Sequence, residues 1–418
     1  MIDERGPCRL GDVQDVKARS VRAEMYQDFE SCSWMREEWD RFVEAMSGEI
    51  FLTFDWCRVW WKHYGKGRKL MTFVFRNGSG IVGLLPMYRE RVRLGPICVT
   101  AVKTLGTDFT PITVSLPLKR EFLKEILSAL RMLIEEECKW DIVQIGAVAG
   151  IYGSTDEFVD CLKAAFPNPS RIETREEGQQ TYFRTEANWD EYVKKLPKKQ
   201  RTNARRAFRD VEARKLNITS CLAKVEDYEK AFDEFVEMHQ AYWRGLLKPG
   251  HFGAWPQSYE FHREAVGVQM ARGRLRLVQI IFDGRCVDYE YIYKNGNTYY
   301  WFLNARSSDL YETGIDFKWI ALRAKHDFAL SEGVSCIDSM RGEYDYKVLM
   351  GGEQLPIRSI IVTPSEGLRG LKVRGFRILA RLIDIAYAKI WRRRVAPKIH
   401  YRVGSFWKVW IKSHVLSS

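Results

Sequence analysis

The spacing of apolar residues predicts a helix and a hairpin in the N-terminal part of the chain. From Thr53 onward, aromatic and branched residues recur at intervals of three and four, the period of a helix with one buried face. These residues are Trp56, Val59, Trp60 and Tyr64. The apolar runs 71–76 and 81–88 then enclose the turn "NGSG", which indicates a hairpin. The amphipathic stretch "REFLKEILSALRMLIEEECK" and the apolar strand "WDIVQIGAV" complete a mixed α/β unit that we expect to end near residue 187.

The second half of the chain repeats this combination of helices and strands. The stretch "YEKAFDEFVEMHQAYWRG" predicts a helix, and the runs "RLRLVQIIF", "RCVDYEYIY" and "NTYYWFLNA" predict three strands. Asp283-Gly284 and Asn295-Gly296-Asn297 separate these runs, and such residues favour the positive φ of hairpin turns. After the loop "RSSDLYETG" we expect a helix over residues 315–330, the strand "SCIDSM" and a final strand pair that ends in "IRSIIVT".

The stretch "DSMRGEYDYK" forms a polar turn directly after a predicted buried strand. Asp338, Arg341, Gly342, Tyr346 and Lys347 lie within ten positions of one another. One interpretation is structural: Asp338 pairs with Arg341 and only shapes a bend. The other is a site for a developing negative charge, which requires cationic or hydrogen-bonding donors such as Lys347.

Positive charge is concentrated at the C-terminal end. Residues 366–418 contain thirteen Lys or Arg and two acids, so this segment carries +11 of the formal net charge of +12. Apolar residues recur at helical spacing within it, with the basic residues mostly off that stripe, which predicts a basic amphipathic helix. The apolar residues are Leu368, Leu371, Leu379, Leu382, Ile383, Ala386 and Ile390. Two arrangements fit this helix: it lies on an anionic membrane surface, or it docks on the protein with a solvated basic face.

A second basic run, "YVKKLPKKQRTNARRAFRDVEARKLN", covers residues 192–217. Its density of Lys and Arg suits the phosphates of a nucleic acid or of a nucleotide-type ligand. No zinc-finger spacing, RNP motif or homeodomain-like helix accompanies the run, which disfavours nucleic acid as a partner.

The composition is that of a packed protein, because 46% of the residues are hydrophobic and the thirteen prolines form no low-complexity run. The nine cysteines include no C-x-x-C pair, so we expect reduced thiols. The first twenty residues lack an apolar stretch, and no apolar run approaches the roughly 20 residues of a membrane span. We therefore expect a cytoplasmic protein, or one that is peripheral on the inner face of the cell membrane.

The motifs of several other enzyme classes are missing. The seven histidines form no H-E-x-x-H pair, and the chain has no G-x-S-x-G elbow, P-loop or strand-following G-x-G-x-x-G. The sequence therefore disfavours zinc proteases, α/β-hydrolases and dinucleotide-binding folds, and we expect no metal.

The order of elements in the second half resembles the acyltransferase fold of the GNAT superfamily. Residues 187–363 are similar to the BioF2-like acetyltransferase domain of the CelD/BcsL family, a relative of the FemAB aminoacyltransferases. The resemblance is carried by Arg201, Arg205, Arg206, Trp243, Gly245, "GRLRLVQIIFDG", "NTYYWFLNARSSDLYETG" and "IDSMRGEYDYK". In the first half it is carried by "FLTFDWCRVWW", "LLPMYRE", Leu105-Gly106 and Asp108.

This resemblance implies a fold class and domain boundaries. The expected fold is α/β (α+β), with two tandem GNAT-like mixed-sheet units followed by the basic helical tail. The expected divisions are an N-terminal tail (1–20), a GNAT-like domain (21–187), a BioF2-like acyltransferase domain (188–363) and the basic tail (364–418). The active groove is expected mainly in the second unit.

The implied activity is transfer of an acyl group such as acetyl from acyl-CoA to an amine or hydroxyl. The acceptor would be a sugar or polysaccharide precursor of the cell envelope, either small or lipid-linked. In a FemAB-like alternative the donor is aminoacyl-tRNA and the acceptor a peptidoglycan precursor, which would give the basic run an RNA to bind. The long helical hairpin of many Fem enzymes has no evident counterpart here. A third alternative is a catalytically silent GNAT-like scaffold at the membrane.

Acyl transfer needs a donor for the tetrahedral oxyanion, a base for the acceptor's proton and an acid for the leaving group. The candidates for the oxyanion donor are Lys347 and Arg341. The candidates for the base are Asp338, Asp288 and Glu290. The candidates for the acid are Tyr346 and a tyrosine of the three predicted strands. Asp288 and Glu290 share one face of their strand, and they are only hydrophilic edge residues if that face meets water.

The start of the helix after the third strand is the expected seat of the donor's pyrophosphate, because a helix N-terminus offers unpaired N–H groups and partial positive charge. The expected cofactor-binding residues are Asn304, Arg306, Thr313, Gly314 and Ile315. Asp316 stands where the GNAT phosphate loop has a small residue, and Thr313-Gly314 alternatively forms only a helix cap. The expected substrate-binding residues are Trp243, Asp108 and Arg205.

Overall fold

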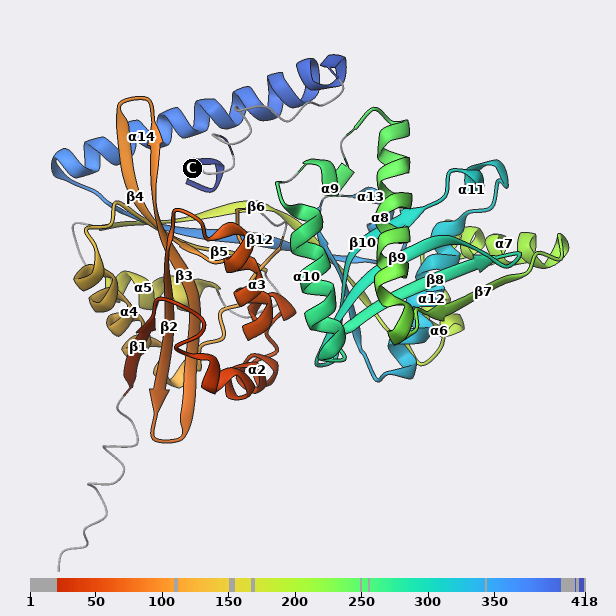
Figure 1. Ribbon diagram of the computed structural model, residues 1–418, viewed down its shortest axis with the longest axis horizontal. Helices are drawn as coiled ribbons and strands as arrows, with labels where there is room; N and C mark the ends of the chain where they lie inside the picture. The colour runs from red at the N-terminus through yellow and green to blue at the C-terminus, as the bar shows by residue number, and fades with distance from the viewer. Residues whose placement is uncertain are drawn as a thin grey trace, which may run out of the picture.

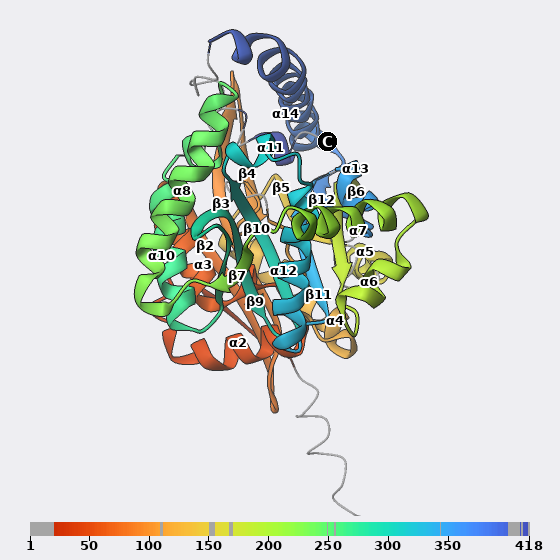
Figure 2. The same cartoon turned by 90° about the vertical axis from the view of Figure 1, so that its right-hand side faces the viewer.

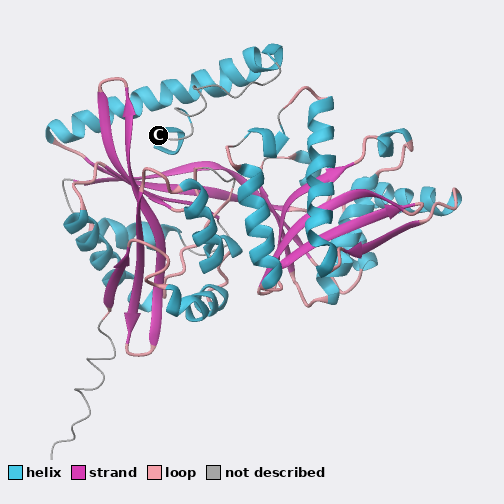
Figure 3. Ribbon diagram, in the orientation of Figure 1, coloured by secondary structure: helices cyan, strands magenta, loops and turns pink. Residues whose placement is uncertain are grey.

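The computed structural model of the protein is built on one twelve-stranded sheet that runs through both halves of the chain (Figure 1, Figure 3). The strand order is β1-β2-β3-β4-β5-β12-β6-β11-β10-β9-β8-β7. The structure describes residues 21–108, 112–149, 155–166, 170–248, 250–254, 256–342, 344–399, 410 and 413–416. The mixed α/β fold class expected from the sequence is therefore confirmed.

The strands are β1 (Arg22–Tyr26), β2 (Lys69–Asn77), β3 (Gly80–Leu94), β4 (Ile97–Thr104), β5 (Ile142–Ala149), β6 (Ser170–Arg184), β7 (Ile218–Leu222), β8 (Leu275–Phe282), β9 (Arg285–Asn295), β10 (Thr298–Arg306), β11 (Cys336–Arg341) and β12 (Glu353–Pro364). The hairpin predicted in the first half is confirmed, because β2 and β3 pair antiparallel across the turn. The three-stranded meander predicted in the second half is also confirmed as β8, β9 and β10.

The helices are α2 (Arg36–Ala45), α3 (Phe54–Tyr64), α4 (Leu123–Glu137), α5 (Thr155–Ala165), α6 (Trp189–Lys195), α7 (Lys198–Ala213), α8 (Tyr228–Gly245), α9 (Gly250–Ala254), α10 (Ser258–Ala271), α11 (Asp309–Glu312), α12 (Phe317–Ser331), α13 (Asp345–Leu349) and α14 (Gly367–Ile385). A π-helical segment, η6 (Ala386–Val395), extends α14. Short 3₁₀ turns cover Ser33–Met35, Ile50–Leu52, Arg120–Phe122, Val225–Asp227, Ala396–Ile399 and His414–Leu416.

Strand β12 joins the two halves. It lies between β5 and β6 and pairs antiparallel with both, although it is the last strand of the second half in sequence. Strand β6 in turn pairs with β11, so the sheet continues without a break from one half to the other. The domain boundaries expected near residues 187 and 363 stay a prediction, because one continuous sheet runs through both halves and does not divide at either position.

An aromatic core also connects the halves. Trp56 of α3, which the sequence predicts as core, contacts Phe261 of α10 and Tyr293 of β9 edge to face, at centroid distances of 5.3 and 5.4 Å. The tyrosines at alternate positions of β9 all face this core. Helices α8 and α10 cover this face of the C-terminal sheet, and α12, α6 and α7 cover the other (Figure 2).

The neighbouring parallel strands β10 and β11 separate after a short contact. They pair only over Thr298–Tyr300 and Cys336–Asp338. Beyond this contact β10 has an irregular register against β9 between Trp301 and Leu303, and Met340 of β11 has a φ of 63°. Both irregularities lie where the strands part, so the backbone opens a gap between two otherwise adjacent strands.

Helix α14 runs along the outside of the N-terminal sheet (Figure 1). It packs through Val373, Phe376 and Ala380 on a small apolar cluster that includes strands β3, β4, β5 and β12. The predicted amphipathic helix is therefore present and docked. Within the described residues, none of the helices combines the length and apolar character that crossing a bilayer requires.

Candidate functional site

A cavity of about 590 Å³ lies in the gap between β10 and β11, with α8 on one side and the start of α13 on the other. Six residues expected at the site from the sequence line it together: Trp243, Asn304, Arg306, Arg341, Tyr346 and Lys347. They come from three separate stretches of chain, and the parting of the two strands brings them to one place.

Lys347 has the most distinctive environment in this cavity. Its ammonium donates a hydrogen bond to the Ser339 carbonyl oxygen at 2.6 Å, and its side chain is nearly buried. The Nζ atom lies 5.7 Å from the ring centroid of Trp301 and 5.0 Å from that of Tyr344, so it is attracted to two aromatic faces. Burial lowers the pKa of Lys347 to about 8, and the Asp338 carboxylate opposes that shift.

Asp338 lies behind the cavity wall. One carboxylate oxygen accepts a hydrogen bond from Gln180 Nε2, and the other accepts one from the Met340 backbone N–H at 2.8 Å. Burial raises the pKa of Asp338 to about 7, and these hydrogen bonds oppose the shift. The carboxylate thus holds the strained backbone at Met340 beside Lys347.

The structural interpretation of the turn, in which Asp338 pairs with Arg341, is wrong. Arg341 instead forms an ion pair with Glu177 of β6 at 2.8 Å. This pairing holds the Arg341 guanidinium at the edge of the cavity, while Asp338 points into the interior toward Gln180.

Asp288 and Glu290 do not face water, so their interpretation as hydrophilic edge residues is wrong. Both are fully buried on the α12 side of β9. Asp288 pairs with Arg306 at 2.5 Å, and Glu290 pairs with Lys325 of α12 at 2.7 Å. Burial raises the pKa of both carboxyl groups, and the basic partners oppose the shift. Arg306 therefore lines the cavity with its carboxylate partner behind it, while Asp288, Glu290 and Lys325 are absent from the lining.

The start of α12 lies apart from the cavity. Gly314 has a φ of 66° with open space around its Cα, and Thr313 accepts a hydrogen bond from Arg214 through its carbonyl oxygen. The Ile315 N–H donates to the Thr313 hydroxyl in a turn before the helix, whereas the N-cap of α12 is Asp316 and makes no side-chain cap hydrogen bond, so the interpretation of Thr313-Gly314 as the helix cap is wrong. Thr313, Gly314 and Ile315 are absent from the lining of the cavity. Their role in binding the donor therefore stays a prediction.

Two expected substrate-binding residues also lie elsewhere. Asp108 is buried in the N-terminal half, where Arg68 donates to it at 2.7 Å and Lys103 lies at 3.5 Å. Arg205 is exposed on α7. Neither residue lines the cavity between β10 and β11, and their roles stay predictions.

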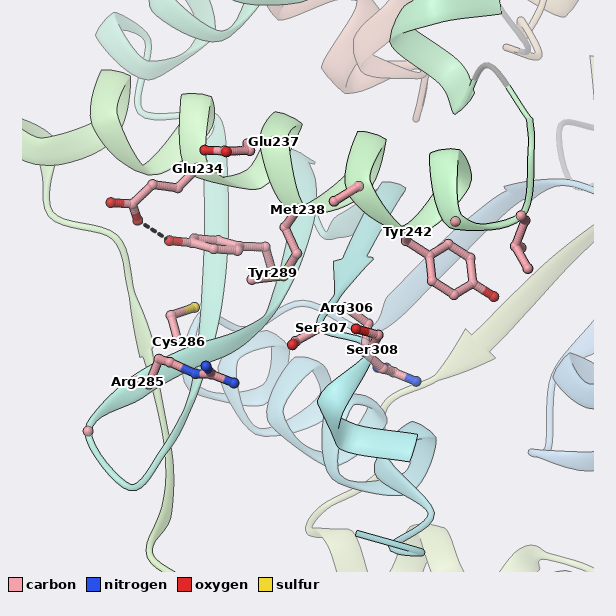
Figure 4. Close-up of a pocket in the computed structure, with 14 residues that line it drawn as sticks. Glu234, Glu237, Met238, Tyr242, Arg285, Cys286, Tyr289, Arg306, Ser307 and Ser308 are labelled. Carbon is pink, nitrogen blue, oxygen red and sulfur yellow. Dashed lines mark hydrogen bonds between the residues drawn. The ribbon is translucent and has the colours of Figure 1, made fainter. Parts of the chain in front are cut away.

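A second cavity, of about 1040 Å³, lies on the α8 side of β9 (Figure 4). It shares Tyr242 and Arg306 with the first cavity, so the two meet at this wall. Glu234 projects from α8 and accepts a hydrogen bond from the Tyr289 hydroxyl at 2.5 Å. Polar side chains of the β8–β9 turn and of the loop after β10 complete it: Arg285, Ser307 and Ser308.

Several residues around the site were not predicted from the sequence. Trp301 and Tyr344 contact Lys347, and Lys325 neutralises Glu290. Of these, Lys325 left a signal, because it stands on the apolar stripe of the helix between Ala321 and Ala329, where a surface lysine would not. Trp301 gave none, since an aromatic residue in a predicted strand reads equally well as core. Among the described residues, no group of three or more His, Cys, Asp or Glu could hold a metal ion.

Comparison with known proteins agrees with this geometry. The family profile described as "Acetyltransferase (GNAT) domain" matches residues 198–348, the segment that contains the meander, α12, β11 and the cavity. A search of curated proteins gave no match.

Among solved structures, FemX superposes with a TM-score of 0.55 at 11% identity, over 78% of this chain and 95% of FemX. L-PGS from Bacillus licheniformis gives a TM-score of 0.45 at 10% identity, over 82% of this chain and 95% of that protein. A tandem GNAT protein from the clavulanic acid biosynthesis pathway gives 0.42 at 11% identity, over 82% and 98%. At such identities the likeness to FemX shows a shared fold and does not extend to its substrate. Residues 198–348 therefore match the acetyltransferase domain of the GNAT superfamily, within a chain that shares the fold of FemX.

Proposed function

We propose that the protein transfers an acyl group from acyl-CoA to an amine or hydroxyl of a sugar or cell-envelope polysaccharide precursor in the cytoplasm. The observation that supports this most is the cavity between β10 and β11, which has Lys347 in its wall and lies inside the GNAT domain. GNAT domains generally bind acyl-CoA, which is why we propose this donor.

Lys347 is the proposed donor to the developing oxyanion. As the acceptor nitrogen or oxygen bonds to the thioester carbon, negative charge develops on the carbonyl oxygen. One N–H of the Lys347 ammonium is engaged by Ser339, which leaves two for that oxygen. The rings of Trp301 and Tyr344 lie beside the ammonium, and the burial of Lys347 lowers the local dielectric, which strengthens the interaction.

The carbon–sulfur bond then breaks, and the thiolate that leaves needs a proton. Tyr346 lines the cavity, and burial raises its pKa to about 12, so its phenol is protonated at neutral pH and is the proposed acid. The acceptor must also lose a proton. Asp338 and Glu290 lie behind the wall, so either carboxylate acts as the base only through an intervening group. We propose that water in the cavity takes this proton directly.

The second cavity is the proposed acceptor site. It meets the first at Tyr242 and Arg306, so an acceptor held there can reach a carbonyl beside Lys347. Its acids Glu234 and Glu237 suit an acceptor that carries an amine, and the hydroxyls of Ser307 and Ser308 suit a sugar.

Binding of acyl-CoA tests this function. At about 100 times its dissociation constant, a ligand that binds only the folded state stabilises it by about 2.7 kcal/mol. We expect acetyl-CoA to raise the melting temperature of the full-length protein, measured by differential scanning fluorimetry. Desulfo-CoA, a matched ligand without a thioester, should raise it as well. A melting curve that neither ligand moves, together with no release of free thiol from acetyl-CoA, contradicts the proposal.

The pH dependence of transfer tests the role of Lys347. Its charged form is lost as the pH rises through its pKa of about 8, so the rate should fall on the alkaline side near pH 8. The Asp338 carboxylate raises this pKa, so in Asp338→Asn the fall should move to lower pH. The measurement is kcat/KM against pH for both proteins. An alkaline limb that stays in place in Asp338→Asn contradicts the assignment.

An aminoacyl-tRNA donor is the second candidate, and the basic face of α7 favours it. Lys198, Lys199, Arg205, Arg206 and Arg209 are exposed on this helix. Helix α7 packs against α12, and Arg214 at its C-terminal end bonds the loop before α12. Stabilisation by aminoacyl-tRNA but not by acetyl-CoA would select this donor. Stabilisation by neither would favour a non-catalytic scaffold.

A further inference from the structure

We propose that the outer face of α14 and the basic cavity at its N-terminal end bind the surface of a membrane that contains anionic phospholipids. This inference does not depend on acyl transfer, because α14 packs on strands of the N-terminal half (Figure 1), whereas the two cavities described above are lined by residues 234–347.

A stripe of exposed apolar side chains runs along the outer face of α14. Its residues are Leu368, Leu371, Ile378, Leu382 and Ile385, which are between 39% and 87% exposed. At the pitch of an α-helix these positions fall within about 100° of arc. The helix is held on the sheet by its opposite side, so docking leaves this stripe uncovered. A continuous apolar face marks an interaction surface, whereas isolated exposed apolar residues do not.

Unpaired basic side chains border one edge of the stripe. Arg374 and Arg381 are exposed there, and within the described part of the chain neither forms an ion pair. The backbone carbonyl of Ser365 is the hydrogen-bond partner of Arg374. Further exposed bases follow beyond the end of α14: Lys389, Arg394 and Lys398.

The other edge of the stripe opens into a basic cavity of about 990 Å³ that has Leu368 in its wall. Seven of its lining residues are Lys or Arg, and five of these form ion pairs with Glu90, Asp108, Glu137 or Asp141. Arg91 and Lys139 are exposed in it and have no ion-pair partner among the residues that the structure describes. These two cations at the mouth of a polar cavity suit a phosphodiester group.

The combination of these features selects an anionic bilayer as the occupant. An apolar stripe between two basic edges matches the depth profile of such a surface, where phosphate groups lie above hydrocarbon. A second copy of the chain would bring the same bases opposite one another, and like charges would repel. Charge complementarity therefore favours lipid over self-association.

Vesicle sedimentation with the full chain tests the proposal. We expect binding to vesicles of phosphatidylcholine with about one third phosphatidylglycerol, and at least tenfold weaker binding to phosphatidylcholine alone. The variant Leu371→Glu/Leu382→Glu should bind at least about 100-fold more weakly, because two anchors are lost and two like charges are added. Arg374→Gln/Arg381→Gln should bind about 30-fold more weakly, because each of the two arginines contributes a similar share of the electrostatic attraction to anionic lipid.

The matched control is Met132→Glu/Leu330→Glu, which replaces exposed apolar residues of α4 and α12 with the same change of charge. It should bind like the wild type, and unchanged melting temperatures confirm that all variants fold. Three results overturn the proposal: no binding to anionic vesicles, equal binding to neutral vesicles, or equal loss in the control. A wild-type dimer, seen by light scattering, that Leu371→Glu/Leu382→Glu converts to a monomer also overturns it.

Discussion

Replacing Lys347 by alanine should lower the rate of acyl transfer about 100-fold to 1000-fold while leaving the affinity for the donor within a factor of about three. The ammonium interacts with the carbonyl oxygen most strongly once that oxygen carries charge, so its loss raises the barrier more than it weakens the ground state. The measurement is single-turnover kinetics with saturating acetyl-CoA, with the dissociation constant obtained separately by calorimetry.

Tyr344→Leu is a useful companion to Lys347→Ala. It keeps an apolar side chain beside the ammonium but removes one of its two aromatic faces, so we expect a loss of about tenfold or less. A Lys347→Ala protein that binds the donor normally and turns over at the wild-type rate removes Lys347 from the mechanism. A protein that loses donor binding and rate in equal measure assigns Lys347 to binding alone.

Replacing Lys325 by methionine should lower the free energy of unfolding by about 3–5 kcal/mol, because it leaves the buried carboxylate of Glu290 without a counter-charge. Lys325 also lies 3.7 Å from the ring centroid of Trp301, so the change removes a cation–π contact under the cavity floor. Urea unfolding at pH 8 followed by tryptophan fluorescence measures the effect.

Two further variants define the cause of this loss. Lys318→Met removes an ion pair with Asp316 from the surface of the same helix and should cost less than about 1 kcal/mol. Glu290→Leu/Lys325→Met removes both buried charges and should recover most of the stability lost in Lys325→Met. If the single and the double variant unfold at the same urea concentration, the uncompensated charge is not the cause.

Local patterns were sufficient to predict most of the elements. The meander is an example, because its turns at Asp283-Gly284 and at Gly296 adopt the positive φ that those residue types favour. The insertion of β12 between β5 and β6 was not predictable in this way. Hydrogen bonds between distant strands leave no periodic trace in either strand, and β12 pairs with partners more than 150 residues earlier.

The residues of the candidate site also differ in whether the sequence could predict them. Arg341, Tyr346 and Lys347 were predictable because they are close together in sequence and fall within the stretch that resembles the family. Their partners were not, since Glu177 and Gln180 lie about 160 residues before the groups they contact. The interpretation in which Asp338 pairs with Arg341 was wrong for this reason: the two residues are close in sequence, but strand β6 supplies the partner of each.

The position of β12 has a consequence for how the chain acquires its structure during synthesis. Among the described strands, β6 pairs with β11 and β12 alone, and both leave the ribosome more than 150 residues after it. At usual translation speeds this delay is on the order of ten to thirty seconds. During that time β5 and β6 present open edges on which nascent chains can associate. The sheet of the N-terminal half is therefore complete only after the C-terminal half has been synthesised.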